Sequence, residues 1–336
     1  MDESKYILYC AVRKKRLVYD TLYSILTLIY KIASNEIINI IIVTDQASLF
    51  YTELKNMNIP LNIKITIDDI DKNTINDWTK NVNIYGVKIH ALKRFFYKYK
   101  KNVLFVDSDM FFVNNPVPLF EFIDERNTVL MYRKRQFNLF EIICSRREDV
   151  DDSIIMKNNI IVINNKYTIP FNCSCYESGV IGVNYLNKNI IDDVIDFYNE
   201  FYDCFKYDNS EEIAFGYIFQ NKLNIKFASY VLNHYSNIDV IRYFIGYSLK
   251  KYFCNDELRL KEFLNHYNIK LSDLDNLNLS YEYIKYFIIL FKTFAFKQNL
   301  SWENIILCAL SDNTFANTPL ERKKLYEFTE KFKKIF

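Results

Sequence analysis

Hydrophobic positions in the first third of the chain follow two alternating spacings. Continuous apolar runs rich in β-branched residues predict buried strands, and apolar residues three or four positions apart predict helices. The predicted strands span 5–12, 37–43, 61–67 and 103–106, and the predicted helices span 17–33, 49–56 and 87–99. This order predicts an α/β fold with a mostly parallel central sheet flanked by helices, with ligands bound at the carboxyl ends of the strands.

The pattern changes twice further along the chain. Strands are predicted at 128–132, 160–163 and 177–185, helices at 190–205 and 211–220, and a charged surface loop at 145–152. After about residue 240 the strand patterns end and the remaining segments have helical spacing. We therefore predict a first domain over residues 1–240 and a C-terminal helical region over residues 241–336.

Composition limits the kinds of function. Half of the 336 residues are hydrophobic, which is enough for a large core and excludes a disordered chain. The formal net charge of +2 gives no bulk attraction for nucleic acid, so no nucleic-acid partner is predicted. The chain has five glycines and neither GxGxxG nor GxxxxGK[ST], which disfavours the Rossmann and P-loop modes of phosphate binding.

The location of the protein is predicted from its ends and its cysteines. The N-terminus lacks the apolar stretch of a signal peptide, and no uncharged apolar run reaches the ~18 residues of a membrane span. Seven scattered cysteines favour reduced thiols, and we expect a cytoplasmic protein. The basic segment 323–336 allows peripheral contact with an anionic membrane, although a solvated helix face is the simpler interpretation.

The strongest chemical signal follows the strand VLFV. Asp107 and Asp109 are one residue apart at the end of this strand, so both side chains can reach one hard cation such as Mg²⁺ or Mn²⁺. A cation held by few carboxylates keeps positions free for diphosphate oxygens. The alternative interpretation is a turn in which the two acids only cap the backbone.

These residues resemble the GT-A glycosyltransferases, especially family 8-like enzymes of the glycogenin and galactosyltransferase type. The resemblance covers about residues 5–240 in motif order and is carried by KIHAL, which starts at Lys88, followed by VLFVDSDMFFVNNP. It implies a nucleotide-sugar donor, with a UDP-sugar favoured, and Mn²⁺ or Mg²⁺ as the cofactor. By this resemblance Asp107 and Asp109 would hold the metal, and the residues that contact the nucleotide would be Ala11, Val12, Arg13, Lys88, Asp107 and Ser108.

Later motifs extend the same resemblance. The family element N-[SA]-G-[VI] matches the chain at Ser178 and Gly179, with Glu177 in place of Asn. Gly179 would let the backbone approach the donor closely. His234, after the apolar stretch 225–232, would be the third metal ligand, and the acidic element near the donor sugar falls on Glu211 and Glu212. If the enzyme inverts the configuration of the sugar, Glu177, Glu211 or Glu212 can act as general base.

The sequence thus predicts a metal-dependent glycosyltransferase, retaining by resemblance, whose acceptor is a glycan, a lipid or a protein. Two alternatives stay open at this point. A metal-dependent nucleotidyltransferase also uses paired acids on an α/β sheet, although the loop VRKKR lacks the glycines such an enzyme usually has. A non-catalytic module that binds nucleotide sugars is the other alternative.

Overall fold

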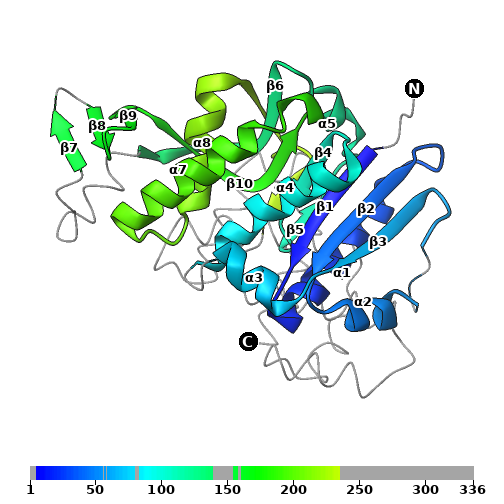
Figure 1. Ribbon diagram of the computed structural model, residues 1–336. Coiled ribbons are helices and arrows are strands. Elements are labelled where there is room, and N and C mark those ends of the chain that lie inside the picture. Colours follow the sequence, from blue (N-terminus) through cyan, green and yellow to red (C-terminus); the bar gives the residue numbers. More distant parts are fainter. Residues whose placement is uncertain are drawn as a thin grey trace, which may run out of the picture. The chain divides into compact units, whose positions relative to one another are not determined.

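The computed structural model describes residues 5–55, 57, 59–79, 83–138, 154–157 and 160–234 (Figure 1). All of these except Lys55 and Met57 belong to one compact unit. The predicted surface loop 145–152 and the predicted helical region 241–336 lie outside the described residues. The division of the chain at residue 240 therefore stays a prediction.

Strands and helices alternate along this unit. The first part contains β1 (Lys5–Ala11), α1 (Lys15–Ile29), β2 (Ile38–Thr44), α2 (Ala47–Leu54), β3 (Ile63–Asp69), α3 (Lys72–Thr79), the 3-10 helix η1 (Ile84–Gly86), α4 (Val87–Tyr99), β4 (Val103–Val106), β5 (Met110–Phe112) and α5 (Val117–Glu121). The second part contains β6 (Asn127–Asn138), β7 (Ile154–Lys157), β8 (Ile160–Ile163), β9 (Tyr167–Pro170), β10 (Ser174–Val183), η3 (Tyr185–Asn187), α7 (Ile190–Phe205), α8 (Ser210–Lys222), β11 (Asn224–Phe227) and β12 (Leu232–His234).

Seven of the described strands form the central sheet, in the order β11-β6-β10-β4-β1-β2-β3. Within this sheet β10 runs antiparallel to both of its neighbours, and the other six strands run in one direction. The predicted fold class, α/β with a mostly parallel central sheet flanked by helices, is confirmed. The sequence did not reveal the direction of β10, because a strand buried on both faces is a continuous apolar run in either direction.

Both faces of the sheet are covered by helices. One face carries Leu8, Ile41 and Phe105, which belong to one core cluster with apolar side chains of α4, α7 and α8. Helix α1 packs against β1 and β5, and Figure 1 shows it behind the sheet, with α4 and α7 in front. In the described part of the chain, no helix is both long and apolar enough to span a membrane.

The topology brings several loops to one edge of the sheet. Strand β1 lies between β2 and β4 and runs parallel to both, so the carboxyl ends of β1 and β4 lie side by side. A separate antiparallel ladder pairs β5 with β12 and sets His234 opposite Met110. Because Met110 directly follows Asp109, this ladder brings His234 to the acids at the end of β4.

Candidate functional site

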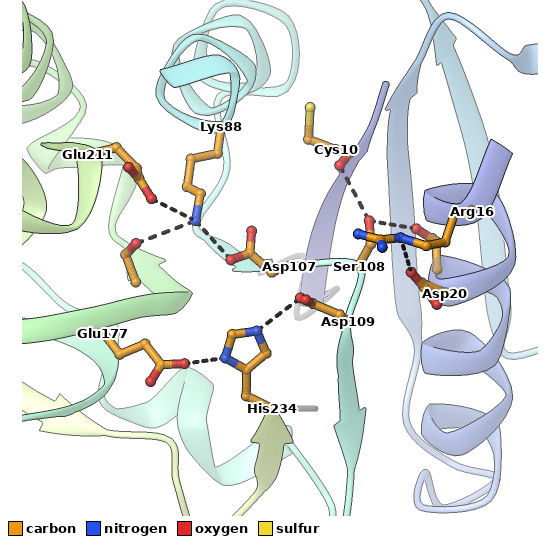
Figure 2. A network of polar contacts seen from close by, with 12 residues as sticks. Cys10, Arg16, Asp20, Lys88, Asp107, Ser108, Asp109, Glu177, Glu211 and His234 are labelled. Carbon is orange, nitrogen blue, oxygen red and sulfur yellow. Dashed lines mark hydrogen bonds and ion pairs between the residues drawn. The ribbon is translucent and has the colours of Figure 1, made fainter. Parts of the chain in front are cut away.

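The turn after β4 holds Asp107 and Asp109. The N–H of Asp107 donates to the carbonyl of Gly179 at 2.8 Å, and the N–H of Met110 donates to the carbonyl of Asp107 at 3.2 Å. Ser108 is directed to the opposite side: its Oγ accepts from Thr21 Oγ1 at 2.9 Å (Figure 2). The structure therefore places the two acids on one side of the turn and uses Ser108 to anchor the turn to α1.

Lys88, in the first turn of α4, lies buried among carboxylates. Its Nζ is 2.8 Å from Asp107 Oδ2, 3.4 Å from Ser178 Oγ and 3.7 Å from Glu211 Oε1 (Figure 2). Burial disfavours the ammonium form, but Asp107 and Glu211 outweigh it and raise the pKa of Lys88 above its ordinary value. Lys88 is thus a fixed positive charge beside the first acid of the Asp-x-Asp motif.

The two carboxylates around Lys88 are hard to ionise. Burial raises the pKa of Asp107 to about 6, although Lys88 opposes the shift. Burial also raises the pKa of Glu211 to about 8, again against the effect of Lys88. Glu211 is 2% exposed, and its Oε2 has no hydrogen-bond partner within the described part of the chain. At neutral pH Glu211 is therefore mostly protonated, and its buried Oε2 is an unsatisfied polar atom among the described residues.

His234 joins the second acid to Glu177. Its Nε2 is 3.1 Å from Asp109 Oδ1, and its Nδ1 is 2.5 Å from Glu177 Oε1 (Figure 2). Burial disfavours the imidazolium, yet Asp109 and Glu177 hold the pKa of His234 well above its ordinary value. His234 in turn lowers the pKa of Asp109, against the effect of burial. Asp109, Glu177 and His234 thus form a second cluster of charged side chains, beside the cluster around Lys88.

An irregularity in β10 directs two consecutive residues to these groups. The pairing register of β10 with β6 shifts between Glu177 and Ile181. Successive strand residues normally point to opposite faces, and a bulge re-aims them. Here Glu177 contacts His234 while Ser178 contacts Lys88. A Cβ at Gly179 would lie 3.1 Å from Met110 Sδ and 3.7 Å from Asp107 Oδ2, so the glycine lets β10 pass close to the acidic turn.

The donor atoms around Asp109 suit a hard divalent cation. Asp109 Oδ1 and His234 Nε2 lie 3.1 Å apart as a hydrogen-bonded ion pair. Two ligand atoms at right angles on an octahedral ion and ~2.1 Å from it lie about 3.0 Å apart, so a cation that replaced the Nε2 proton would require little movement of either side chain. Within the described residues, no three His, Cys, Asp or Glu side chains are arranged to hold a metal ion, and Asp107 is turned to Lys88. The pair fits a cation whose other ligands are water and substrate oxygens.

The other predicted nucleotide contacts lie at the carboxyl end of β1 and directly after it. Ala11 and Val12 are buried, and Arg13 is exposed with φ of 67°, in the left-handed region that non-glycine residues seldom adopt. The N–H of Arg13 donates to Asp45 Oδ1 at 2.8 Å, and its guanidinium donates to Asn76 at 2.9 Å. The structure brings these residues to the carboxyl edge of the sheet, where the side chain of Arg13 reaches α3.

Not all predicted and observed residues coincide. Glu212, in the first turn of α8, is partly exposed, whereas Glu211 reaches Lys88. Sequence reasoning assigned no contact to Ser178 and Thr21, which position Lys88 and Ser108. Ser178 lies inside the predicted glycine-containing element, but only the bulge shows where it points. Thr21 lies on the apolar side of a helix and carries no sequence signal.

Comparison with known proteins adds little to this description. No family model matches the chain, and no curated protein matches it. Among solved structures, mouse xyloside xylosyltransferase 1 in its apo form is similar, with a TM-score of 0.44 and 12% sequence identity over 67% of this chain and 84% of that chain. Similarity of this degree assigns no function to the chain.

Proposed function

We propose that this protein is a metal-dependent glycosyltransferase that moves a sugar from a nucleotide sugar, with a UDP-sugar favoured, to an acceptor hydroxyl. One observation carries the proposal: Asp109 and His234, 125 positions apart in the sequence, lie with donor atoms 3.1 Å apart at the carboxyl end of β4. Beside them Lys88 supplies a buried positive charge. A strand-end turn in which the acids only cap the backbone requires neither the imidazole nor the lysine.

A divalent cation, when bound, supplies positive charge that stabilises the leaving nucleoside diphosphate. Asp109 and His234 would hold it, with Asp107 as the neighbouring acid. The chain's own contribution is electrostatic. Lys88 stays protonated because Asp107 lies 2.8 Å from it, and a fixed charge in a water-poor site stabilises developing negative charge without reorganisation.

Glu211 is not suited to removing a proton from the acceptor. Its raised pKa keeps a proton on it at neutral pH, and its Oε2 has no partner in the described part of the chain. A buried, protonated carboxyl cannot take a proton from an acceptor hydroxyl. Glu177 is occupied by His234. Glu212 is then the remaining candidate for a general base; the retaining course, which we propose by resemblance, needs no dedicated base.

The test uses the full chain, a panel of sugar nucleotides and Mn²⁺. Metal-dependent release of UDP from a UDP-sugar, with water as a substitute acceptor if necessary, would support the proposal. Asp109→Ala should abolish that release without unfolding the protein, because Asp109 is a partly exposed residue at the end of a strand. Wild-type rates in Asp109→Ala would contradict the assigned site. Pyrophosphate release from nucleoside triphosphates would instead indicate a nucleotidyltransferase, and no release from either panel would indicate a binding module.

A further inference from the structure

Glu177 and Asp109 contact opposite nitrogens of one imidazole. Glu177 Oε1 lies 2.5 Å from Nδ1 of His234, and Asp109 Oδ1 lies 3.1 Å from Nε2. Figure 2 shows the ring standing between the two carboxylates, with Glu177 coming from β10 and Asp109 from the turn after β4. The two acids therefore have different positions relative to the Asp-x-Asp motif. Nε2 of the ring faces this motif, and Glu177 contacts the ring from the other side.

The strand that carries His234 fixes its backbone but not its ring. Strand β12 spans only three residues, and its ladder with β5 sets the position of the His234 Cα opposite Met110. Rotation about the side-chain bonds of His234 remains unless a partner restrains it. The contact with Glu177 supplies that restraint, and Glu177 itself is 5% exposed and held in the β10 bulge.

The same contact also selects a tautomer. When a cation binds, the ring gives up one proton, and only loss from Nε2 leaves the form with Nδ1–H and an Nε2 lone pair directed at the cation site. A carboxylate can accept from Nδ1–H but cannot donate to Nδ1, so Glu177 favours that form. Histidines that bind metals commonly donate their second nitrogen to a carboxylate in this way, which also makes the ligand nitrogen more basic.

We infer that Glu177 is a positioning residue, whose carboxylate holds the imidazole of His234 with Nε2 directed at the cation site beside Asp109. This inference rests on the proposed metal dependence. It differs from the general-base role expected from the sequence, because Glu177 acts through His234 and not on an acceptor hydroxyl.

The test measures Mn²⁺ affinity directly, by the loss of the free-Mn²⁺ electron paramagnetic resonance signal, with and without UDP. Removal of a residue that orients a metal ligand typically weakens binding about 10- to 100-fold, and we expect a loss of this size for Glu177→Ala. Glu177→Gln keeps an oxygen that accepts from Nδ1–H and should bind within about threefold of the wild type. If Glu177→Ala does not fold, Glu177→Asp replaces it, because its shorter side chain withdraws the carboxylate from the ring.

Thermal unfolding without metal separates positioning from a structural role. A purely structural role would lower the melting temperature and leave Mn²⁺ affinity unchanged at low temperature. Glu53→Ala, which removes a buried glutamate of α2 outside the site, is the matched control and should keep wild-type affinity. Equal Mn²⁺ affinity in the wild type and Glu177→Ala would overturn the inference alone. Failure of the wild type to bind Mn²⁺, with or without UDP, would overturn the proposed metal dependence and this inference with it.

Discussion

Replacing Glu211 by glutamine should stabilise the protein increasingly as the pH rises. Burial raises the pKa of Glu211 from 4.5 to about 8, so between these values the folded state holds a proton that the unfolded state has released. Raising the pH through this window therefore shifts the equilibrium toward the unfolded state. Glutamine does not titrate, so Glu211→Gln removes this dependence while keeping the shape of the side chain.

The size of the effect follows from the two pKa values. The free energy of unfolding that ionisation of Glu211 removes from the wild type is about 1 kcal/mol at pH 5, about 3 kcal/mol at pH 7 and about 4 kcal/mol at pH 8. The amide of glutamine also changes the free energy of unfolding, but by an amount that does not vary with pH. The difference in unfolding free energy between Glu211→Gln and the wild type should therefore widen by about 3 kcal/mol from pH 5 to pH 8.

Urea unfolding at pH 5, 6, 7 and 8 measures this difference. Glu212→Gln, which changes the adjacent and partly exposed carboxylate, is the matched control. The difference in unfolding free energy between variant and wild type should widen with pH more for Glu211→Gln than for Glu212→Gln. A difference that is constant from pH 5 to pH 8, or that narrows, would refute the conclusion that Glu211 is protonated beside Lys88.

Two further predictions concern packing and charge. In β10, Gly179→Ala should weaken Mn²⁺ affinity about tenfold, because its Cβ would lie only 3.1 Å from Sδ of Met110, the residue paired with His234. Gly182→Ala, whose Cβ would lie 2.8 Å from two core side chains, should instead lower the unfolding free energy by about 1–3 kcal/mol and leave that affinity unchanged. The reverse pattern in metal titration and urea unfolding would contradict the site. Asp68 accepts two hydrogen bonds from Arg94, at 2.8 and 2.9 Å, and these outweigh burial and lower its pKa. Asp68→Asn should therefore lower the free energy of unfolding by about 1–3 kcal/mol at pH 7. This loss should become smaller as the pH falls below 4, because the wild-type carboxyl then gains its proton. A loss of unfolding free energy that does not change with pH in urea unfolding would contradict the ion pair.

The repeating part of the fold was predictable from the sequence. The bounds predicted for α4, β4 and α7 agree with the structure, because long apolar periodicities and a buried four-residue run leave few alternatives. Helix α3 was missed because only Ile75 and Thr79 of its eight residues are buried, which leaves no apolar stripe. The apolar stretch 225–232 is two short strands, β11 and β12, separated by a turn in which Val231 N–H donates to Ala228 O at 2.8 Å.

The site was predictable only in its residue types. Asp107, Asp109, Lys88 and His234 were chosen from motifs, and the structure brings them together at one edge of the sheet. The contact between Glu177 and His234, which lie 57 positions apart in the sequence, could not be predicted, because it depends on a bulge in β10 and on the pairing of the three-residue strand β12 with β5. Local pattern fixes where a strand ends; contacts between distant side chains depend on register and on the bulge.

The central claim is that Asp109 and His234 hold a divalent cation for a nucleotide-sugar donor. A crystal of the full chain grown with Mn²⁺ and UDP, measured at the manganese absorption edge, tests it most directly. The account predicts an anomalous peak bonded to Asp109 and to Nε2 of His234, next to the diphosphate, with Nδ1 still on Glu177. Bound UDP without a manganese peak, or a peak away from Asp109 and His234, would contradict it.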